Sequence, residues 1–192
     1  MILMKGNIGY TNAVNLGKEA LEKLDPQEVC ANSGVMWDDG EYIIPWMGES
    51  VRFNDGKIEE QIIWYHYLTA KGPRDMKGGY ITYKQVPGGA IYNDNFIKRA
   101  VKPMVKAFSY DLDGFLKRGE MMGGWQIPMG HMAFTLKLLP YVPLTYVIWQ
   151  GDDEVPASGN ILYDETAPEW LCAEDLVVVA SLPVYKMFGM KV

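Results

Sequence analysis

The sequence predicts an α+β fold in which an antiparallel sheet, built from a meander and a hairpin, packs with about five helices. The predicted elements run in the order helices, short strands, helices, hairpin and helix, without the strand–helix alternation of a parallel doubly wound sheet. The chain has 192 residues, of which 48% are hydrophobic and 22% are charged. This composition fits one soluble domain, and no linker rich in Ser, Gly or Pro divides the chain. We therefore expect residues 1–192 to form a single domain.

Helical spacing of apolar residues identifies the helices. Residues 11–24 place apolar side chains on one stripe between lysines and glutamates, which predicts an amphipathic helix. Residues 25–28 read Asp-Pro-Gln-Glu, a start signal for a short second helix that ends near Gly34. Further helices are predicted over residues 58–71, 93–109, 111–123 and 174–188, with breaks or bends at Pro103 and Pro183. The helix over 58–71 is expected to bury the stripe Ile58, Ile62, Tyr65 and Thr69.

Strand signals fall in two stretches. Three short β-prone runs between residues 35 and 58 are separated by Asp-Gly turns and predict a meander. Later, Met132, Phe134, Leu136 and Leu138 alternate with His131, Ala133, Thr135 and Lys137, as in a strand with one apolar face. A Pro-Tyr-Val-Pro turn and a return over residues 144–150 complete a hairpin. Residues 160–163 are expected to add a strand.

Charge is unevenly distributed along the chain. The formal net charge is -6, which argues against nucleic acid and anionic membrane surfaces as partners. Residues 138–185 contain eight carboxylates and no Lys or Arg, whereas the other residues contain 18 basic and 16 acidic side chains. This local excess of acid predicts loop carboxylates that bind a ligand, a cation or a basic partner, or that remain solvated.

The two cysteines, Cys30 and Cys172, are far apart and have no metal-ligand spacing. This pattern favours a reducing, cytoplasmic location, and no secretory signal or stretch long enough to span a membrane is visible. No nucleophile elbow and no phosphate-binding glycine loop is present, so the sequence identifies no catalytic residue and no cofactor.

The predicted ligand site is a recess near the segment 149–164. We expect Trp149 and Trp170 to form its walls and Asp152, Glu154 and Asp164 to form its edge, since aromatic residues with polar tips favour cleft walls. Its ligand would be a small molecule or a cofactor. His131 is a further candidate because it lies between two methionines, a combination that ligates haem or soft metals.

A metal site is the alternative interpretation of the same segment. Asp152, Asp153 and Glu154 follow a predicted strand, and clustered carboxylates on a loop suit magnesium or calcium. Their spacing does not match the calcium loop of helix–loop–helix proteins.

Several short strings occur together in a characteristic order. They include Ile-Pro-Trp-Met-Gly at 44–48, Trp-Tyr-His-Tyr-Leu at 64–68 and Trp-Gln-Gly-Asp-Asp-Glu-Val-Pro-Ala at 149–157. From about residue 25 onward the chain resembles an uncharacterised family, a domain of unknown function, of mostly anaerobic bacteria and archaea. In the family pattern an Asp usually stands where this chain has His131. Some members resemble fusions with an iron–sulfur segment, which implies cofactor-linked anaerobic metabolism and an iron–sulfur protein as a partner.

These observations give three functional expectations. The first is a cytoplasmic ligand-binding or accessory protein without catalytic machinery of its own. The second is a divalent-metal-dependent enzyme that uses the acidic residues 152–175. The third is a protein–protein interaction module with a basic or iron–sulfur partner.

Overall fold

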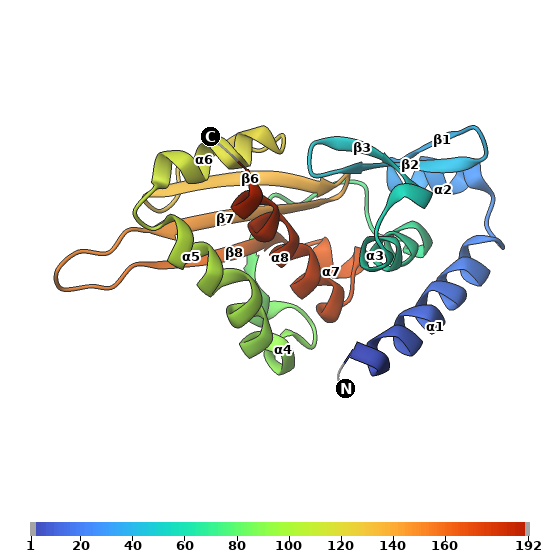
Figure 1. The fold of residues 1–192 in the computed structure, drawn as a ribbon. Helices are drawn as coiled ribbons and strands as arrows, with labels where there is room; N and C mark the ends of the chain where they lie inside the picture. The colour runs from blue at the N-terminus through green and yellow to red at the C-terminus, as the bar shows by residue number, and fades with distance from the viewer. Residues whose placement is uncertain (1–2, 191–192) are drawn as a thin grey trace.

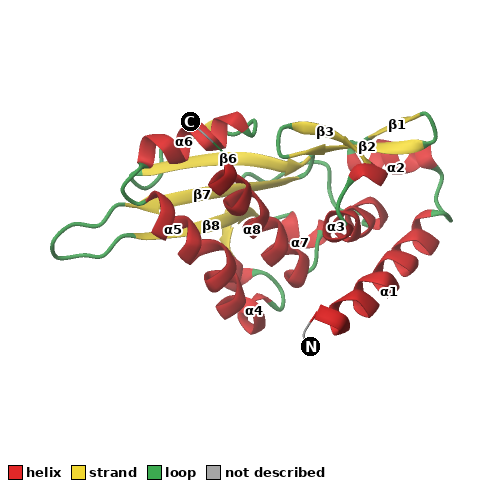
Figure 2. Ribbon diagram, in the orientation of Figure 1, coloured by secondary structure: helices red, strands yellow, loops and turns green. Residues whose placement is uncertain are grey.

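The computed structural model describes residues 3–190 and has an α+β fold with two antiparallel sheets (Figures 1 and 2). The N-terminal part contains α1 (Leu3–Leu21), α2 (Pro26–Ser33), β1 (Met36–Asp38), β2 (Glu41–Trp46), β3 (Glu49–Arg52), a 3-10 turn (Phe53–Asp55) and α3 (Ile58–Thr69). The C-terminal part contains β4 (Tyr80–Thr82), a 3-10 turn (Tyr83–Gln85), α4 (Gly89–Phe96), a π-helical turn (Ile97–Val101), α5 (Lys102–Phe108), α6 (Leu112–Met121), β5 (Trp125–Gln126), β6 (Met132–Leu139), β7 (Val142–Trp149), β8 (Ser158–Asp164), α7 (Ala167–Trp170) and α8 (Ala173–Gly189).

The meander and the hairpin form separate sheets. Strands β1, β2 and β3 make a three-stranded sheet, and the larger sheet has the order β4-β8-β7-β6-β5. The short strands β4 and β5 occupy the two edges of the larger sheet, so its hairpin has no free edge to which the meander could pair. The predicted antiparallel α+β class is confirmed, and the two predicted strand groups are both present.

One face of the five-stranded sheet carries the main core. Phe134 on β6 packs against Phe115 of α6 with a centroid distance of 4.8 Å. Tyr146 and Tyr163 donate hydrogen bonds to the Ala180 and Leu176 carbonyls of α8. Figure 1 shows α8 and α5 crossing this face of the sheet. The alternation predicted for residues 131–138 therefore points its apolar side chains towards the helices.

Local signals explain most helix ends. Asp25 accepts hydrogen bonds from the Gln27 and Glu28 amides, and Gly34 ends α2 in the left-handed conformation, as predicted. The helix predicted over 93–109 begins earlier, at Gly89, and passes through the π-helical turn before Pro103. Proline lacks an amide hydrogen, so the break in regular α-helix falls close to the predicted position. The last helix is uninterrupted at Pro183.

The predicted inner stripe of α3 is right at Tyr65 but wrong at Ile58, and residues outside the stripe are buried as well. Ile58 is exposed, while Ile63, Trp64, Tyr65, Tyr67 and Leu68 are buried. Residues on this helix are covered from more than one side, because Phe53 packs on Trp64 and α1 reaches Tyr65 through Gly17. A helix buried on several sides does not show a single amphipathic stripe. Within residues 3–190, no helix combines the length and apolar character that crossing a membrane requires.

Candidate functional site

The face of the five-stranded sheet opposite the helices carries polar and aromatic side chains. Trp125, Thr135 and Thr145 are directly paired across β5, β6 and β7, so they lie in one row. Lys137 pairs with Pro143, two positions further along the same strands, and side chains two apart point to the same face. Register therefore brings an indole, two hydroxyls and an ammonium group together on the open face.

A recess of about 180 Å³ lies on this face. Its lining includes Tyr80, Trp125, Thr135, Lys137, Thr145 and Asp164. Tyr80 and Trp125 come from the opposite edge strands, and both are about half exposed. The volume corresponds to roughly six water molecules, so the recess, named here the sheet recess, fits a small molecule.

Two hydroxyls form part of the lining of the sheet recess. Thr135 and Thr145 are buried, and their Oγ1 atoms lie 2.8 Å apart in a hydrogen bond. Two hydroxyl groups carry two hydrogens, and the bond between them uses only one. Among the described residues neither hydroxyl has another partner, so one donor remains for a molecule in the recess.

Lys137 gives the sheet recess a positive charge. Its side chain is exposed, and among residues 10–190 no carboxylate lies within ion-pair distance of it. Lys77 and Glu165, on neighbouring segments, pair with each other at 4.0 Å. An incoming anion would thus meet an ammonium group that has no competing internal partner.

Asp164 anchors one wall of the recess. Its carboxylate accepts hydrogen bonds from the amides of Lys77 (3.3 Å), Gly78 (2.7 Å) and Thr166 (2.9 Å) and from the Thr166 hydroxyl (2.7 Å). Gly78 has φ +71°, a conformation that favours glycine. Burial raises the pKa of Asp164, but these hydrogen bonds outweigh burial and hold the pKa below its usual range. Asp164 is an ionised structural group that ties the loop before β4 to the end of β8.

The structure does not bring the two predicted tryptophan walls together. Trp149 is the last residue of β7 and is 40% exposed. Trp170 is buried, stacks on Tyr141 at 5.2 Å and donates from Nε1 to the Pro73 carbonyl at 3.2 Å. Tyr141 precedes β7, so the two tryptophans lie at opposite ends of this strand, roughly 25 Å apart along it. Of the predicted wall and edge residues, Asp164 lines the sheet recess.

The predicted acidic residues before β8 lie on an exposed loop. Asp152 accepts hydrogen bonds from the Glu154 and Val155 amides at 2.9 and 2.7 Å, and these bonds, with that from Val155 contributing most, lower its pKa. Asp153 and Glu154 are exposed in the same loop, which extends beyond the sheet in Figure 1. Among the described residues, no three His, Cys, Asp or Glu side chains come together to hold a metal ion. The magnesium or calcium interpretation stays a prediction.

His131 lies next to the base of that loop. Its Nδ1 accepts a hydrogen bond from the Gln150 amide at 2.8 Å, and its own amide donates to the Ile148 carbonyl at 3.0 Å. The imidazole therefore helps to join the start of β6 to the end of β7. Ligation of a haem or soft metal by His131 stays a prediction.

A second polar cluster was not predicted from the sequence. His66 Nδ1 on α3 lies 2.9 Å from Asp175 Oδ2 on α8, and the Cys172 thiol donates to the same oxygen at 3.2 Å. The hydrogen bond with Asp175 raises the pKa of His66, although burial opposes it. His66 and Asp175 are 109 positions apart in sequence, which explains why local spacing did not reveal the pair. Trp125, Lys137 and the threonine pair were also missed as site residues, although the hairpin alternation had placed Thr135 and Lys137 on one face.

Comparison with known proteins gives a family without an assigned activity. No curated protein and no solved structure matches this chain. The sheet recess lies entirely within the region that the matching family model covers. Residues 25–186 match the family described as Domain of unknown function (DUF3786), and the chain therefore belongs to that family.

Proposed function

We propose that this protein is a binding protein for a small planar carboxylate, which it holds in the sheet recess. The observation that carries the proposal is the convergence of an unpaired ammonium and a buried hydroxyl pair in one recess beside Trp125. Lys137 would pair with the carboxylate, the remaining threonine hydrogen would be donated to one of its oxygens, and Trp125 would contact the planar body.

Within the recess, Lys137 is the group that favours an anionic ligand. The Asp164 carboxylate is already satisfied by four donors, so Lys137 is the charged group left to interact with a ligand. Charge-assisted hydrogen bonds are stronger than neutral ones, and the recess walls reduce competition from water. The recess contains no nucleophile with an adjacent base, so binding rather than catalysis is the proposed activity.

Benzoate is a suitable test probe, and benzamide is its uncharged counterpart of similar shape. We expect benzoate to bind and benzamide to bind at least tenfold more weakly, because only benzoate pairs with Lys137. Lys137→Met should weaken benzoate binding about tenfold, and Thr145→Val should weaken it severalfold. Titrations by calorimetry or NMR would measure both effects.

Lys117→Met, on the exposed surface of α6, is the matched control and should leave benzoate binding unchanged. Equal binding of benzoate to the wild type and to Lys137→Met would refute the proposal.

The proposal extends to the wider metabolic role of the protein. A cytoplasmic accessory protein of cofactor-linked anaerobic metabolism would use the recess to hold a metabolite or part of a cofactor. This setting rests on the family resemblance, and a native mass spectrum of protein purified from its own host would reveal a bound acid.

A protein partner is a second candidate because the acidic loop is unpaired. Asp153 and Glu154 have no ion pair within the described chain, and the neighbouring Val155 is 61% exposed. We infer that a basic or iron–sulfur protein docks on this loop. Salt-sensitive capture of such a partner from host lysate should be lost in a combined Asp153→Asn and Glu154→Gln variant.

A further inference from the structure

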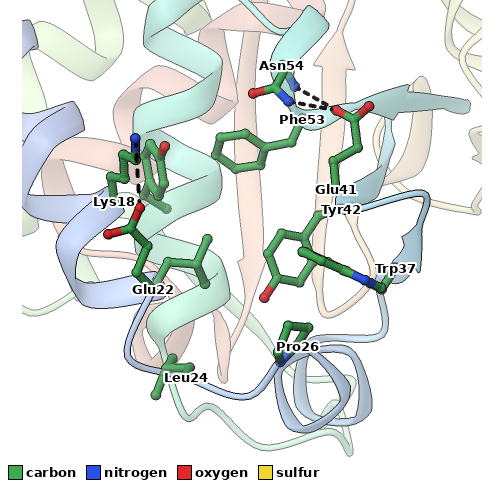
Figure 3. Close-up of a pocket in the computed structure, with 12 residues that line it drawn as sticks. Lys18, Glu22, Leu24, Pro26, Trp37, Glu41, Tyr42, Phe53 and Asn54 are labelled. Carbon is green, nitrogen blue, oxygen red and sulfur yellow. Dashed lines mark hydrogen bonds and ion pairs between the residues drawn. The ribbon is translucent and has the colours of Figure 1, made fainter.

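A second cavity lies at the other end of the molecule, between α1, the meander and α3 (Figure 3). Its volume is about 320 Å³, within the usual range for small-molecule sites. Four aromatic side chains contribute to its lining, namely Trp37, Tyr42, Phe53 and Tyr65. We call it the aromatic cleft.

Tyr42 presents an unused hydrogen-bonding group to the aromatic cleft. The side chain is 6% exposed, and Figure 3 shows its hydroxyl directed towards the space beside α1. Among the described residues no group hydrogen-bonds to this hydroxyl. The Trp37 ring packs against the Tyr42 ring edge to face at 4.6 Å and fixes its position. The hydroxyl oxygen is not among the fully buried side-chain atoms that lack a partner, so it is open to the cleft and can donate its hydrogen to a molecule bound there.

The electrostatics of the aromatic cleft disfavour a charged ligand. Glu22 pairs with Lys18 at 3.8 Å, as Figure 3 shows, and Glu41 is bound by Arg52 at 2.9 Å and by Asn54. No carboxylate in the lining is thus left for a cation. Lys18, the cation of the lining, is held by the same ion pair and is not left for an anion. Burial, followed by nearby acidic groups, raises the pKa of Tyr42 to about 12, so its hydroxyl stays protonated and can donate.

Helix α1 closes the cleft through a glycine contact. A Cβ atom on Gly17 would lie 2.6 Å from the Cβ and Cγ atoms of Tyr65, so only glycine permits the helices to approach this closely. Lys18, Leu21, Glu22 and Leu24 then complete one wall. These residues precede position 25, where the family match begins, so the cleft depends on a helix that the family model does not cover.

We propose that the aromatic cleft binds an uncharged, flat aromatic molecule whose hydrogen-bond acceptor receives the Tyr42 hydroxyl. The site is independent of the sheet recess and differs from it in ligand class. The aromatic rings provide apolar contact on several sides of the ligand, and the phenol sets its orientation.

The test uses coumarin, which is flat and uncharged and has a carbonyl acceptor. The indole N–H signal of Trp37, assigned with Trp37→Phe, reports binding at the cleft in a two-dimensional NMR titration. We expect coumarin to shift this signal, and we expect both naphthalene, which lacks an acceptor, and coumarin-3-carboxylate, which is an anion, to bind at least fivefold more weakly. Tyr42→Phe should weaken coumarin binding about fivefold, the usual effect of one lost hydrogen bond.

Gly17→Leu tests whether α1 forms the wall. The added side chain would displace α1 from Tyr65, and coumarin binding should be lost, whereas Ala20→Leu on the exposed side of the same helix should retain it. Thermal unfolding would establish that each variant is folded. If Gly17→Leu does not fold, Tyr65→Phe provides a second cleft variant.

The proposal is overturned if coumarin leaves the Trp37 signal unchanged, if Tyr42→Phe binds coumarin as the wild type does, or if coumarin-3-carboxylate binds as tightly as coumarin. Benzoate binding to the sheet recess is measured separately, so either site can fail alone.

Discussion

The sheet recess and the aromatic cleft are built in different ways. The recess rests on a five-stranded sheet, and its groups are positioned by strand register and by the hydrogen bonds of Asp164. The cleft lies between a helix and a small sheet, and its groups are positioned by packing of Gly17 on Tyr65 and of Trp37 on Tyr42. The recess contains a free ammonium, whereas the cleft contains carboxylates that are already paired.

This difference indicates which kind of substitution would disrupt each site. Backbone pairing within a sheet is cooperative and tolerates changes at distant side chains, whereas a wall made by one docked helix depends on a few contacts. The recess lies within the residues matched by the family, and the cleft requires residues 18–24 outside them. The recess is therefore built within the family region of this chain, whereas the cleft also needs α1, which lies outside that region.

The largest effect is predicted for Asp164, which supports the wall of the recess. Asp164→Ala removes an acceptor shared by four donors and leaves the buried amide and hydroxyl of Thr166 without a partner, so the free energy of unfolding should fall by about 3 kcal/mol. Benzoate binding should weaken because the loop at Gly78 loses its anchor, while coumarin binding to the cleft should persist. Urea denaturation and the two titrations measure these effects.

The matched control is Asp153→Ala on the exposed loop, which should change stability by less than about 0.5 kcal/mol. Because the folded pKa of Asp164 is lowered, its contribution is present above the unfolded value of about 3.9 and is lost as the pH falls through the folded pKa. Asp164→Asn should lack this acid-dependent part of the stability. A variant as acid-sensitive as the wild type would contradict the assignment.

An intermediate effect is predicted when the affinities for benzoate and for coumarin are both measured in a variant of each site. Lys137→Met should reduce benzoate affinity about tenfold and leave coumarin affinity unchanged, and Tyr42→Phe should do the reverse with about a fivefold loss. The reason is that an ion pair with Lys137 orients benzoate, whereas a single neutral hydrogen bond from Tyr42 orients coumarin. Loss of both ligands in either variant would mean that the sites are coupled or that the fold has changed.

The fold was more predictable from sequence than the sites were. Asp25 as a helix cap, Gly34 as a helix end and the alternation over residues 131–138 are local signals, and each appears in the structure as expected. The stripe of α3 was mispredicted at Ile58, and the burial of Ile63, Trp64 and Tyr67 was missed, because several neighbours cover that helix and their contacts are not encoded in its own periodicity.

The sites depend on contacts between residues that are distant in sequence. Asp164 was predicted at the ligand site, but its partners Lys77 and Gly78 are 87 and 86 positions away. Trp149 and Trp170 are close in sequence, yet the β7–β8 hairpin and α7 separate them in space. Conversely, Trp125 joins Thr145 only because β5, β6 and β7 pair in one register. Composition identified a segment rich in aromatic and acidic residues, but strand register decides which of its side chains meet.

The smallest effect is predicted at the ion pair that joins the two parts of the molecule, between His66 on α3 and Asp175 on α8. The hydrogen bond to Asp175 raises the folded pKa of His66, so the pair stabilises the fold fully below the unfolded pKa of about 6.5, and its contribution is lost as the pH rises through the folded value. Because the His66 side chain is 44% exposed, solvent screening limits the contribution to about 0.5 kcal/mol. Urea denaturation at pH 6 and pH 8.5 should show this decrease in the wild type and in His131→Gln, but not in His66→Gln. If His66→Gln loses the same stability between these pH values, another group is responsible, and the His66–Asp175 pair does not contribute measurably to the free energy of unfolding.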